Sequence, residues 1–248
     1  MNRPRLVGLP DIPSVRPGDA LGEILLRAAQ QAQVELRDGV LVVCQKIVSK
    51  AEGRIVSLAD VSPSQEAIEI AREHDKDPRH IEVVLSETAR IVRRSHGVLI
   101  CETRHGFVCA NAGVDQSNAA EPDTAILLPL DPDASARGIH DALIAAGAGP
   151  LGVIISDTFG RPWREGLVDV ALGCAGIAPI DDRRGGKDWV GRPLEVTATA
   201  TADQLAAAAG LLMVKDAGVP AVWVEGFAPV GEGRLKDTLR DPATDLFR

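Results

Sequence analysis

The stretch GVIISDTFGRPWREG, residues 152–166, decides the fold expected for this chain. Its first four residues are apolar and mostly β-branched and are entered through Pro and Gly, which predicts a short buried strand. Asp157 and Thr158 then lie at the strand tip, where open α/β sheets bind ligands. Asp and Thr offer a hard cation two oxygens, and Arg161 and Arg164 are spaced to contact anionic oxygens. A metal-and-phosphate site is expected, against the alternative of an Asx or ST turn with solvated arginines.

A similar pattern stands earlier in the chain. Residues 40–44 form a continuous apolar run that predicts a buried strand, and the polar stretch 45–54 follows it directly as a loop. Lys46, Lys50 and Arg54 would line a phosphate path from that loop, although lysine-bearing loops are more often simply solvated.

A third polar loop follows a predicted hairpin. The apolar runs 97–101 and 106–110 are its two strands, and the second leads into a Gly-containing loop that carries Asp115 and Asn118. Asx-turn formation is the simpler explanation of these two residues, and metal or nucleotide contact is the alternative. Another strand is expected over 124–129.

Five helices are expected from polar residues that cap a first turn. The clearest follows Asp19, because its apolar residues recur at i, i+3, i+4, i+7 and i+8. The sequence SPSQ from Ser62 has the form of a capping box with Pro at the first helical position, and predicts a helix toward His74. The other expected caps are Asp77, for a helix to about Glu87, Asp133, for one through Ala146, and Asp203, for an Ala-rich helix.

Residues 194–203 alternate between apolar and polar side chains, which predicts a half-buried strand. Its polar face carries Thr197, Thr199 and Thr201. Threonines pair well across strands, and a bare sheet edge accepts another chain, so we expect this strand at a homodimer interface that buries more than about 2,000 Å².

Composition narrows the function classes. The net charge of −8 and the scattered basic residues argue against a nucleic-acid partner. No apolar run approaches about 20 residues, and no apolar segment follows the basic N-terminus, so we expect no membrane segment and a cytoplasmic protein. The four cysteines lack C-x-x-C spacing and are expected to be buried reduced thiols. The histidines form no H-x-x-x-H pattern, which favours magnesium or manganese with oxygen ligands over zinc.

Five motifs, in the same order and spread over essentially the whole chain, resemble signatures of the coenzyme F420-0:L-glutamate ligases. They are GLP at 8–10, VSKAEGR at 48–54, AGVDQSN at 112–118, DTFGRPWR at 157–164 and DLF at 245–247. The resemblance implies an α+β fold of two unlike domains with mixed sheets, in which strand-end loops form a metal-nucleotide site. Residues 1–248 would be one ligase unit of two intertwined subdomains, without the flavin-reductase-like extension that some relatives carry.

The resemblance also implies a reaction. The family joins L-glutamate to the phospholactyl carboxyl of coenzyme F420-0 through an acyl phosphate and a γ-glutamyl amide, with GTP, Mg²⁺ or Mn²⁺ and often K⁺, and its members are dimers. We expect residues of both chains near the bound deazaflavin.

Site residues follow from the same resemblance. Asp115, Asp157 and Thr158 would be metal ligands, and Lys50 and Arg161 would supply fixed positive charge during catalysis. The residues implied to contact GTP are Leu9, Pro10, Asp11, Ile12, Gln45, Lys46, Lys50, Asn118, Met213, Val214, Lys215, Asp216, Ala217, Gly218, Val219 and Pro220.

The chain departs from the family pattern at three places. Many relatives have Ser or Thr at the position of Gln45, Gln-Thr at 167–168, and an amide or acidic residue near Lys215. Two alternatives therefore stay open: a different metal- and nucleotide-dependent amide ligase or kinase acting on another phosphorylated acid, and a non-catalytic GTP-binding homologue.

Overall fold

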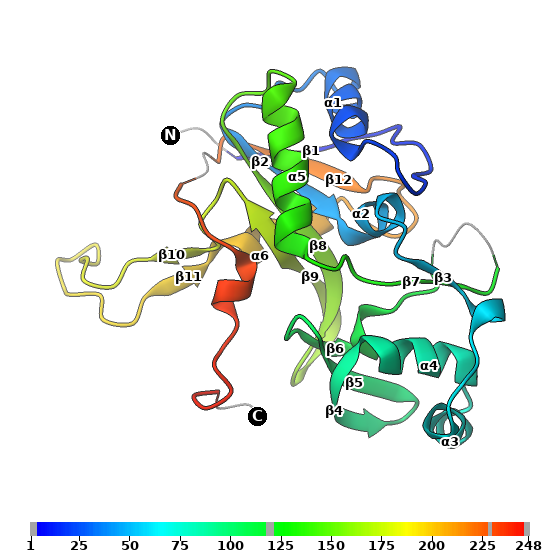
Figure 1. Cartoon of the computed structure of the whole chain (residues 1–248). Coiled ribbons are helices and arrows are strands. Elements are labelled where there is room, and N and C mark those ends of the chain that lie inside the picture. Colours follow the sequence, from blue (N-terminus) through cyan, green and yellow to red (C-terminus); the bar gives the residue numbers. More distant parts are fainter. Residues whose placement is uncertain (1–3, 118–121, 228–229, 246–248) are drawn as a thin grey trace.

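The structure, a computed structural model, describes residues 4–117, 122–227 and 230–245. Within these ranges the chain forms six α-helices together with parallel and antiparallel strand pairs (Figure 1). The expected α+β class with mixed sheets is confirmed. None of the helices in the described ranges is long and apolar enough to cross a membrane.

A five-stranded mixed sheet forms the centre of the molecule. Its order is β1 (Arg5–Gly8), β12 (Ala221–Glu225), β2 (Gly39–Cys44), β8 (Leu151–Arg161) and β9 (Arg164–Ala175). Only β2 and β8 pair in parallel; the other neighbours are antiparallel. The two apolar runs that predicted buried strands are thus confirmed, and they lie next to each other in the sheet.

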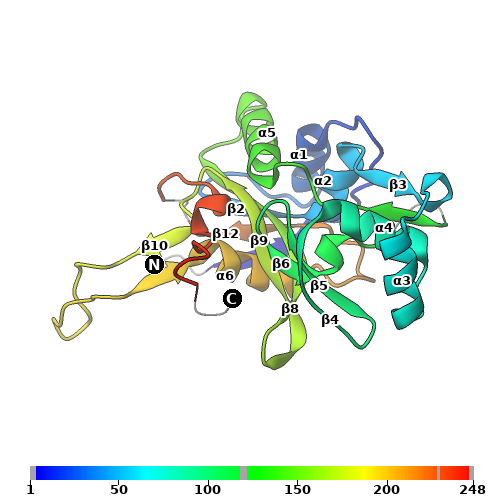
Figure 2. The same cartoon turned by 60° about the horizontal axis from the view of Figure 1, so that its bottom comes forward.

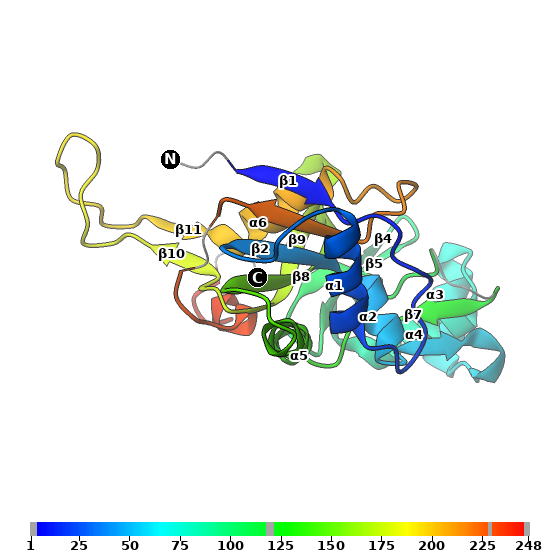
Figure 3. The same ribbon diagram turned by 90° about the horizontal axis from the view of Figure 1, so that it is seen from above.

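Helices cover both faces of this sheet. On one face α1 (Leu21–Gln31) and α5 (Pro132–Ala145) lie side by side and pack on Leu41, Val43 and Val153 (Figures 1 and 3). On the other face α6 (Thr201–Gly210) and the short helix η3 (Leu235–Thr238) pack on Val40, Val42 and Ile154. Since successive strand residues face opposite sides, both sets of apolar side chains are buried, which explains why these strands read as continuous apolar runs.

The helix caps differ from several predictions. Asp77 does cap α4 (Pro78–Glu87), as predicted. Helix α3 (Gln65–His74) is capped by Ser64, whose hydroxyl accepts from Ala67 N, and not by Ser62. Helix α1 begins after Ala20, and the Asp19 carboxylate instead accepts the backbone N–H of Arg16 at 2.8 Å.

Two further caps were wrong because the predicted side chain has a tertiary partner. Asp131 caps α5, whereas Asp133 is buried in the first turn of that helix and accepts the backbone N–H groups of Cys174 and Leu235 at 2.9 and 2.8 Å. Asp203 lies within the first turn of α6 and accepts the N–H of Ala171 at 3.0 Å. In both cases a backbone N–H of β9 donates to the carboxylate that the sequence pattern assigned to the end of the local helix.

A second group of elements is inserted in the sequence between two short strands, β3 (Ile55–Ser57) and β7 (Thr124–Ile126). These two strands pair with each other in antiparallel fashion. We call the described residues between them, 58–117 and 122–123, the insertion. It contains the short helix η1 (Leu58–Asp60), α3, α4, the sheet of β4 (Thr88–Ser95), β5 (Val98–Thr103) and β6 (Val108–Ala110), and the short helix η2 (Asn111–Gly113). These elements pack around a hydrophobic cluster of their own.

The predicted hairpin is confirmed as β5 and β6, and the strand expected over 124–129 is confirmed in its first three residues as β7. Strand β4 has no counterpart among the predictions, because most of its side chains are exposed and three of them are arginines. The β8–β9 hairpin extends from the main sheet along this small sheet (Figure 2).

The half-buried strand predicted over 194–203 is wrong in most of its length. Only Ala198–Ala200 forms a strand, β11, which pairs with β10 (Ile180–Asp182) in a two-stranded ribbon that projects from the body of the chain (Figure 1). Val196 is 88% exposed, whereas Thr197 is partly buried. The alternation therefore has no second layer to pack on within this chain.

Candidate functional site

A cavity of about 470 Å³ lies where the carboxyl end of β2 and the adjacent part of β8 meet the insertion. The three polar stretches predicted at 45–54, around Asp115 and at 157–158 all contribute to its wall. Residues 12–15 and residues in the range 213–220, just before β12, add to the wall, together with Phe159, Gly160 and Leu167 of the β8–β9 hairpin and residues 109–111. Segments far apart in the sequence thus converge at the strand ends, where the sequence predicted a site.

The structure places the predicted residues unequally around this cavity. Those that line it are Ile12, Lys46, Lys50, Asp115, Asp157, Thr158, Met213, Lys215, Gly218, Val219 and Pro220. Those that are described but lie outside its lining are Leu9, Pro10, Asp11, Gln45, Arg161, Val214, Asp216 and Ala217. Asn118 lies outside the described residues.

Lys46 and Lys50 stand on a helix, not on the predicted loop. Helix α2 (Gln45–Ala51) begins directly after β2, and the four-residue spacing puts both lysines on one face, toward the cavity. Gln45 is fully buried instead: its side-chain oxygen accepts the Ser49 hydroxyl at 2.8 Å, and its Nε2 has no hydrogen-bond partner.

Asp157 and Thr158 lie within β8, not at its tip, because β8 continues to Arg161 by pairing with β9. The parallel neighbour β2 ends at Cys44, opposite Ser156, so Asp157 comes directly after the last parallel pair. A register shift between Ile155 and Ser156 marks the same point. Bulges of this kind redirect side chains, and here the strand changes from core to cavity wall.

The surroundings of the Asp157 carboxyl group disfavour its charged form. Burial raises its pKa to about 7; the Thr158 N–H and Lys46 oppose the shift, while the negative charges of Asp115 and Asp169 add to it. Thr158 lies opposite Asp169 in the β8–β9 ladder, and its hydroxyl donates to Asp169 Oδ1 at 2.6 Å. The negative charges of Asp115 and Asp169 therefore both disfavour ionisation of Asp157, and a cation bound beside Asp157 would offset that effect.

Lys46 supplies the positive charge nearest to them. Its Nζ lies 2.7 Å from Asp115 Oδ2 and donates to Ser117 Oγ at 2.6 Å. Ser117 in turn donates its N–H and hydroxyl to Asp115 at 2.7 and 2.9 Å. Burial alone would raise the pKa of Asp115, but the hydrogen bonds from Lys46 and Ser117 outweigh it and lower that pKa.

Lys50 stands one helical turn further along the same wall. Burial and the neighbouring charge of Lys46 lower the pKa of its ammonium group. An anionic ligand would reverse that effect, so the pair of lysines favours phosphate oxygens at this wall.

Arg161 does not reach the cavity. Its guanidinium donates to the carbonyl oxygens of Glu165 and Gly166 in the turn of its own hairpin. The long β8–β9 pairing carries this turn beyond the site, which the prediction of a short strand followed by a loop did not foresee.

Several residues at the site were missed by sequence reasoning. Asp169 was missed because β9 was not predicted; the signal was a turn-forming stretch between two runs able to pair as a hairpin. Cys44 and Cys109 line the cavity, and burial raises the pKa of these thiols to about 11 and 12. All four cysteines are unpaired; three are buried and Cys44 is partly buried. The expectation of reduced thiols is confirmed.

The donor set suits a hard divalent cation. Asp115, Asp157 and Thr158 present oxygen ligands, and the repulsion between the two carboxylates would fall on binding positive charge. Among the described residues no three His, Cys, Asp or Glu side chains are close enough to bind a metal by themselves. A cation here would complete its shell with the hydroxyl of Thr158, phosphate oxygens or water, as Mg²⁺ often does.

Comparisons with known proteins lead to the same family over most of the chain. A family model described as F420-0:Gamma-glutamyl ligase matches residues 10–226, which include every cavity-lining residue. Two relatives, each named coenzyme F420:L-glutamate ligase, come from Methanothermobacter thermautotrophicus (47% identical, covering 98% of both chains) and Methanopyrus kandleri (45% identical, 94% of this chain and 93% of the relative). A third with the same name, from Methanocaldococcus jannaschii, is 41% identical over 88% of both chains.

Proposed function

The chain belongs to the F420-0:gamma-glutamyl ligase family, as its motifs predicted, and from this premise we propose that it joins L-glutamate to the phospholactyl carboxyl of coenzyme F420-0 with consumption of GTP. The observation that carries the proposal is the convergence of Lys46, Lys50, Asp115, Asp157 and Thr158 on one cavity. Two ammonium groups beside a set of oxygen ligands suit a nucleotide triphosphate and its cation.

The proposed chemistry has two steps. In the first, an oxygen of the substrate carboxylate attacks the γ-phosphorus of GTP, the bond to the β–γ bridging oxygen breaks, and GDP leaves. In the second, the glutamate amine attacks the acyl carbon, the acyl carbon–oxygen bond breaks, and inorganic phosphate leaves as the amine loses a proton. Activation is needed because a free carboxylate is a poor acyl donor.

Residues of the cavity take specific roles in this proposal. Lys46 and Lys50 contact phosphate oxygens and hold the triphosphate in line with the acceptor carboxylate. Asp115, Asp157 and Thr158 would hold Mg²⁺ or Mn²⁺, which would neutralise negative charge on phosphate oxygens of the nucleotide. By family resemblance K⁺ would be a further cation. The catalytic role first assigned to Arg161 would require its guanidinium to leave the hairpin turn that now accepts its hydrogen bonds.

We also propose that the chain is organised as two subdomains and acts as a homodimer in the cytoplasm. The separate hydrophobic cluster of the insertion supports the first part. The projecting β10–β11 ribbon supports the second, because Trp189 at its end is fully exposed, at 101%, and Val196 at 88%. Residues of a second chain would then approach the deazaflavin. A 26.2 kDa species with full activity in light scattering would contradict the dimer.

The direct test is product analysis. The protein is incubated with F420-0, GTP, L-glutamate and Mn²⁺ or Mg²⁺, and mass spectrometry follows a product heavier by one glutamyl residue, released with GDP and phosphate. Parallel reactions with ATP and with other phosphorylated acids test for a different amide ligase or kinase. GTP binding without phosphate release for every acceptor would contradict the proposal and indicate a non-catalytic homologue.

A further inference from the structure

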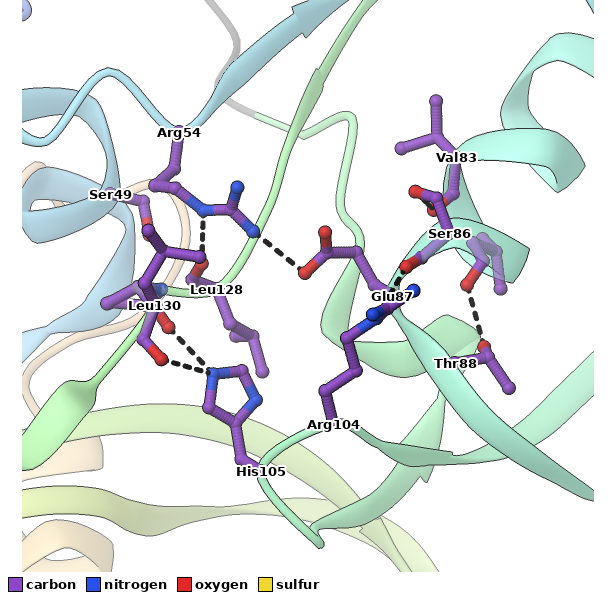
Figure 4. Close-up of polar contacts among 12 residues, drawn as sticks. Ser49, Arg54, Val83, Ser86, Glu87, Thr88, Arg104, His105, Leu128 and Leu130 are labelled. Atoms are coloured by element: carbon purple, nitrogen blue, oxygen red, sulfur yellow. Dashed lines mark hydrogen bonds and ion pairs between the residues drawn. The ribbon is translucent and has the colours of Figure 1, made fainter.

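Arg54, which the sequence placed on a phosphate path, lies away from the cavity, at the junction between the main sheet and the insertion (Figure 4). Its Nη2 lies 2.8 Å from Glu87 Oε2 at the end of α4, and its Nε donates to the carbonyl of Leu128 at 2.9 Å. The two side chains are only 17% and 16% exposed. We call Arg54 and Glu87 the clasp.

The backbone of Arg54 connects the clasp to the cavity wall on the α2 side. Arg54 N donates to Ser49 O at 2.8 Å, which ties it to the helix that carries Lys46 and Lys50. Its carbonyl accepts Leu127 N at 3.0 Å, so the same residue holds the chain as it returns from the insertion.

The returning strand connects the clasp to the opposite wall. Asp115 and Ile126 exchange backbone hydrogen bonds at 3.0 and 2.8 Å, and Ile126 lies in β7, two residues before Leu128. A continuous set of hydrogen bonds therefore runs from Glu87 through Arg54 and β7 to Asp115. Neither member of the clasp touches the cavity itself.

A second contact supports the same junction. His105, in the turn between β5 and β6, approaches the carbonyl oxygens of Pro129 and Leu130 with its Nε2, at 2.9 and 3.1 Å (Figure 4). The insertion is thus attached to the returning chain on both sides of Leu128, and its orientation depends on where that segment is held.

We propose that Arg54 and Glu87 are positioning residues: they fix the insertion, and with it Asp115, at the distance from Lys46 and Asp157 that the reaction needs. The proposal rests on the proposed function only in its kinetic consequence. Arg suits this role better than Lys, because its planar fork binds the Glu87 carboxylate and the Leu128 carbonyl at once and in fixed directions.

A purely structural role predicts something different. Replacing a buried ion pair with apolar side chains of similar volume is often close to neutral for stability. The double variant Arg54→Met/Glu87→Leu also leaves the Leu128 carbonyl without its Arg54 donor, at a cost of about 1 kcal/mol. It should therefore keep its fold and melt within about 5 °C of wild type. If the clasp only stabilised the fold, this variant would also keep full activity.

We expect the double variant to lose function while remaining folded. Misplacement of one cavity wall disturbs transition-state alignment, so kcat should fall at least about tenfold, with KM for GTP changing less than about threefold. Arg54→Lys, which keeps the charge but loses the fork, should also melt within about 5 °C of wild type and show an intermediate kcat. A kcat equal to that of wild type in the folded double variant would overturn the proposal.

The matched control is Arg90→Met/Glu102→Leu. This pair has the same 2.8 Å contact and a carboxylate that is 17% exposed, but both ends lie within the small sheet of the insertion. We expect its kcat to match wild type. An equal loss of kcat in the control would show that any ion pair of the insertion suffices, which contradicts a specific role for the clasp.

Hydrogen exchange separates this proposal from the proposed function. In the clasp double variant the amides of Asp115 and Ile126, which pair with each other, should exchange at least about tenfold faster than in wild type and in the control. This readout needs neither GTP nor F420-0, so it holds even if wild type makes no glutamyl product. Unchanged exchange at both amides would overturn the clasp whatever the activity.

Discussion

Two ion pairs cross the junction between the main sheet and the insertion. They have similar lengths, but they differ in the type of cation and in their position relative to the cavity. Lys46 Nζ lies 2.7 Å from Asp115 Oδ2 inside the cavity, and Arg54 Nη2 lies 2.8 Å from Glu87 Oε2 outside it. Both cations are mostly buried, with Lys46 11% and Arg54 17% exposed, but the carboxylate is 34% exposed in the first pair and 16% in the second.

The chemistry of the cations explains the difference. The Lys46 ammonium is a compact charge on a flexible stem, and Asp115 is also held by Ser117, so an incoming cation or phosphate can displace Lys46 without freeing the loop. The Arg54 fork is shared between a carboxylate and a carbonyl and has no such substitute. Distance alone thus does not distinguish an exchangeable pair from a fixed one.

The largest effect should appear in stability when one partner of each pair is removed. Arg54→Met leaves the Glu87 carboxylate buried without its cation, which should cost about 3–5 kcal/mol of unfolding free energy. Lys46→Met should cost about 1 kcal/mol, because Asp115 keeps Ser117 and partial contact with solvent. Denaturant unfolding of both variants measures the difference. Equal losses would mean that the two pairs are not of different kinds.

The second effect concerns the carboxylate that faces the Lys46 pair across the cavity. Asp157→Asn should leave the fold intact and reduce metal-dependent GTP turnover at least about a hundredfold, the scale of one lost electrostatic stabiliser. Turnover is measured as GDP release under saturating Mn²⁺. Release at nearly the wild-type rate would remove Asp157 from the catalytic site.

Much of this arrangement could be predicted from local pattern. Continuous apolar runs placed β2 and β8 in the core, and polar residues directly after them pointed to the strand ends. The family motifs placed Asp115, Asp157 and Thr158 together, and the structure brings them to one cavity. The strand predictions depend on periodicity and composition over a few residues. The grouping of the three site residues was implied only by the resemblance to a known family.

The features that were predicted wrongly depend on partners that are distant in the sequence. Arg54 looked like a site residue because it follows two lysines, yet Glu87 and Leu128, far along the chain, turn its fork outward. Asp133 looked like a cap, yet it accepts backbone N–H groups of β9 and of η3. Threonine alternation near 199 suggested a sheet that the chain does not build around it. Tertiary partners decide such cases, and a local window does not contain them.

The third effect is the pH dependence of stability in the metal-free protein. The pKa of Asp157 is about 7 in the folded state against an ordinary value of 3.8, so the folded state binds a proton between these values that the unfolded chain has released. Stability should therefore fall as the pH rises from about 4 to 7, by about 2 kcal/mol after allowance for relaxation around the charge. Asp115, with a lowered pKa, acts in the opposite sense and at lower pH.

Unfolding with a chelator present, at pH 5 and pH 8, measures this difference, and Asp157→Asn is the control. The variant should lose the fall in stability between these pH values. Burial lowers the pKa of His80, which acts in the opposite sense in both proteins. A fall in stability from pH 5 to pH 8 that survives in the variant would assign the effect to another residue.

The smallest effect tests whether the Lys46 pair is exchangeable. The Lys46 ammonium contacts Asp115 Oδ2, one of the oxygens proposed to hold the divalent cation. Lys46 and the cation would therefore compete for this oxygen. Because a partly exposed pair is worth about 1 kcal/mol, Lys46→Met should bind Mn²⁺ about fivefold more tightly in the absence of nucleotide. The same variant should bind GTP more weakly, since a phosphate contact is lost. Arg54→Met should not tighten Mn²⁺ binding, because its charge lies outside the cavity. Electron paramagnetic resonance of free Mn²⁺ measures the Mn²⁺ affinity of both variants. Weaker Mn²⁺ binding by Lys46→Met would mean that Lys46 organises Asp115 for the cation instead of competing with it, and the distinction between an exchangeable and a fixed pair would then be lost.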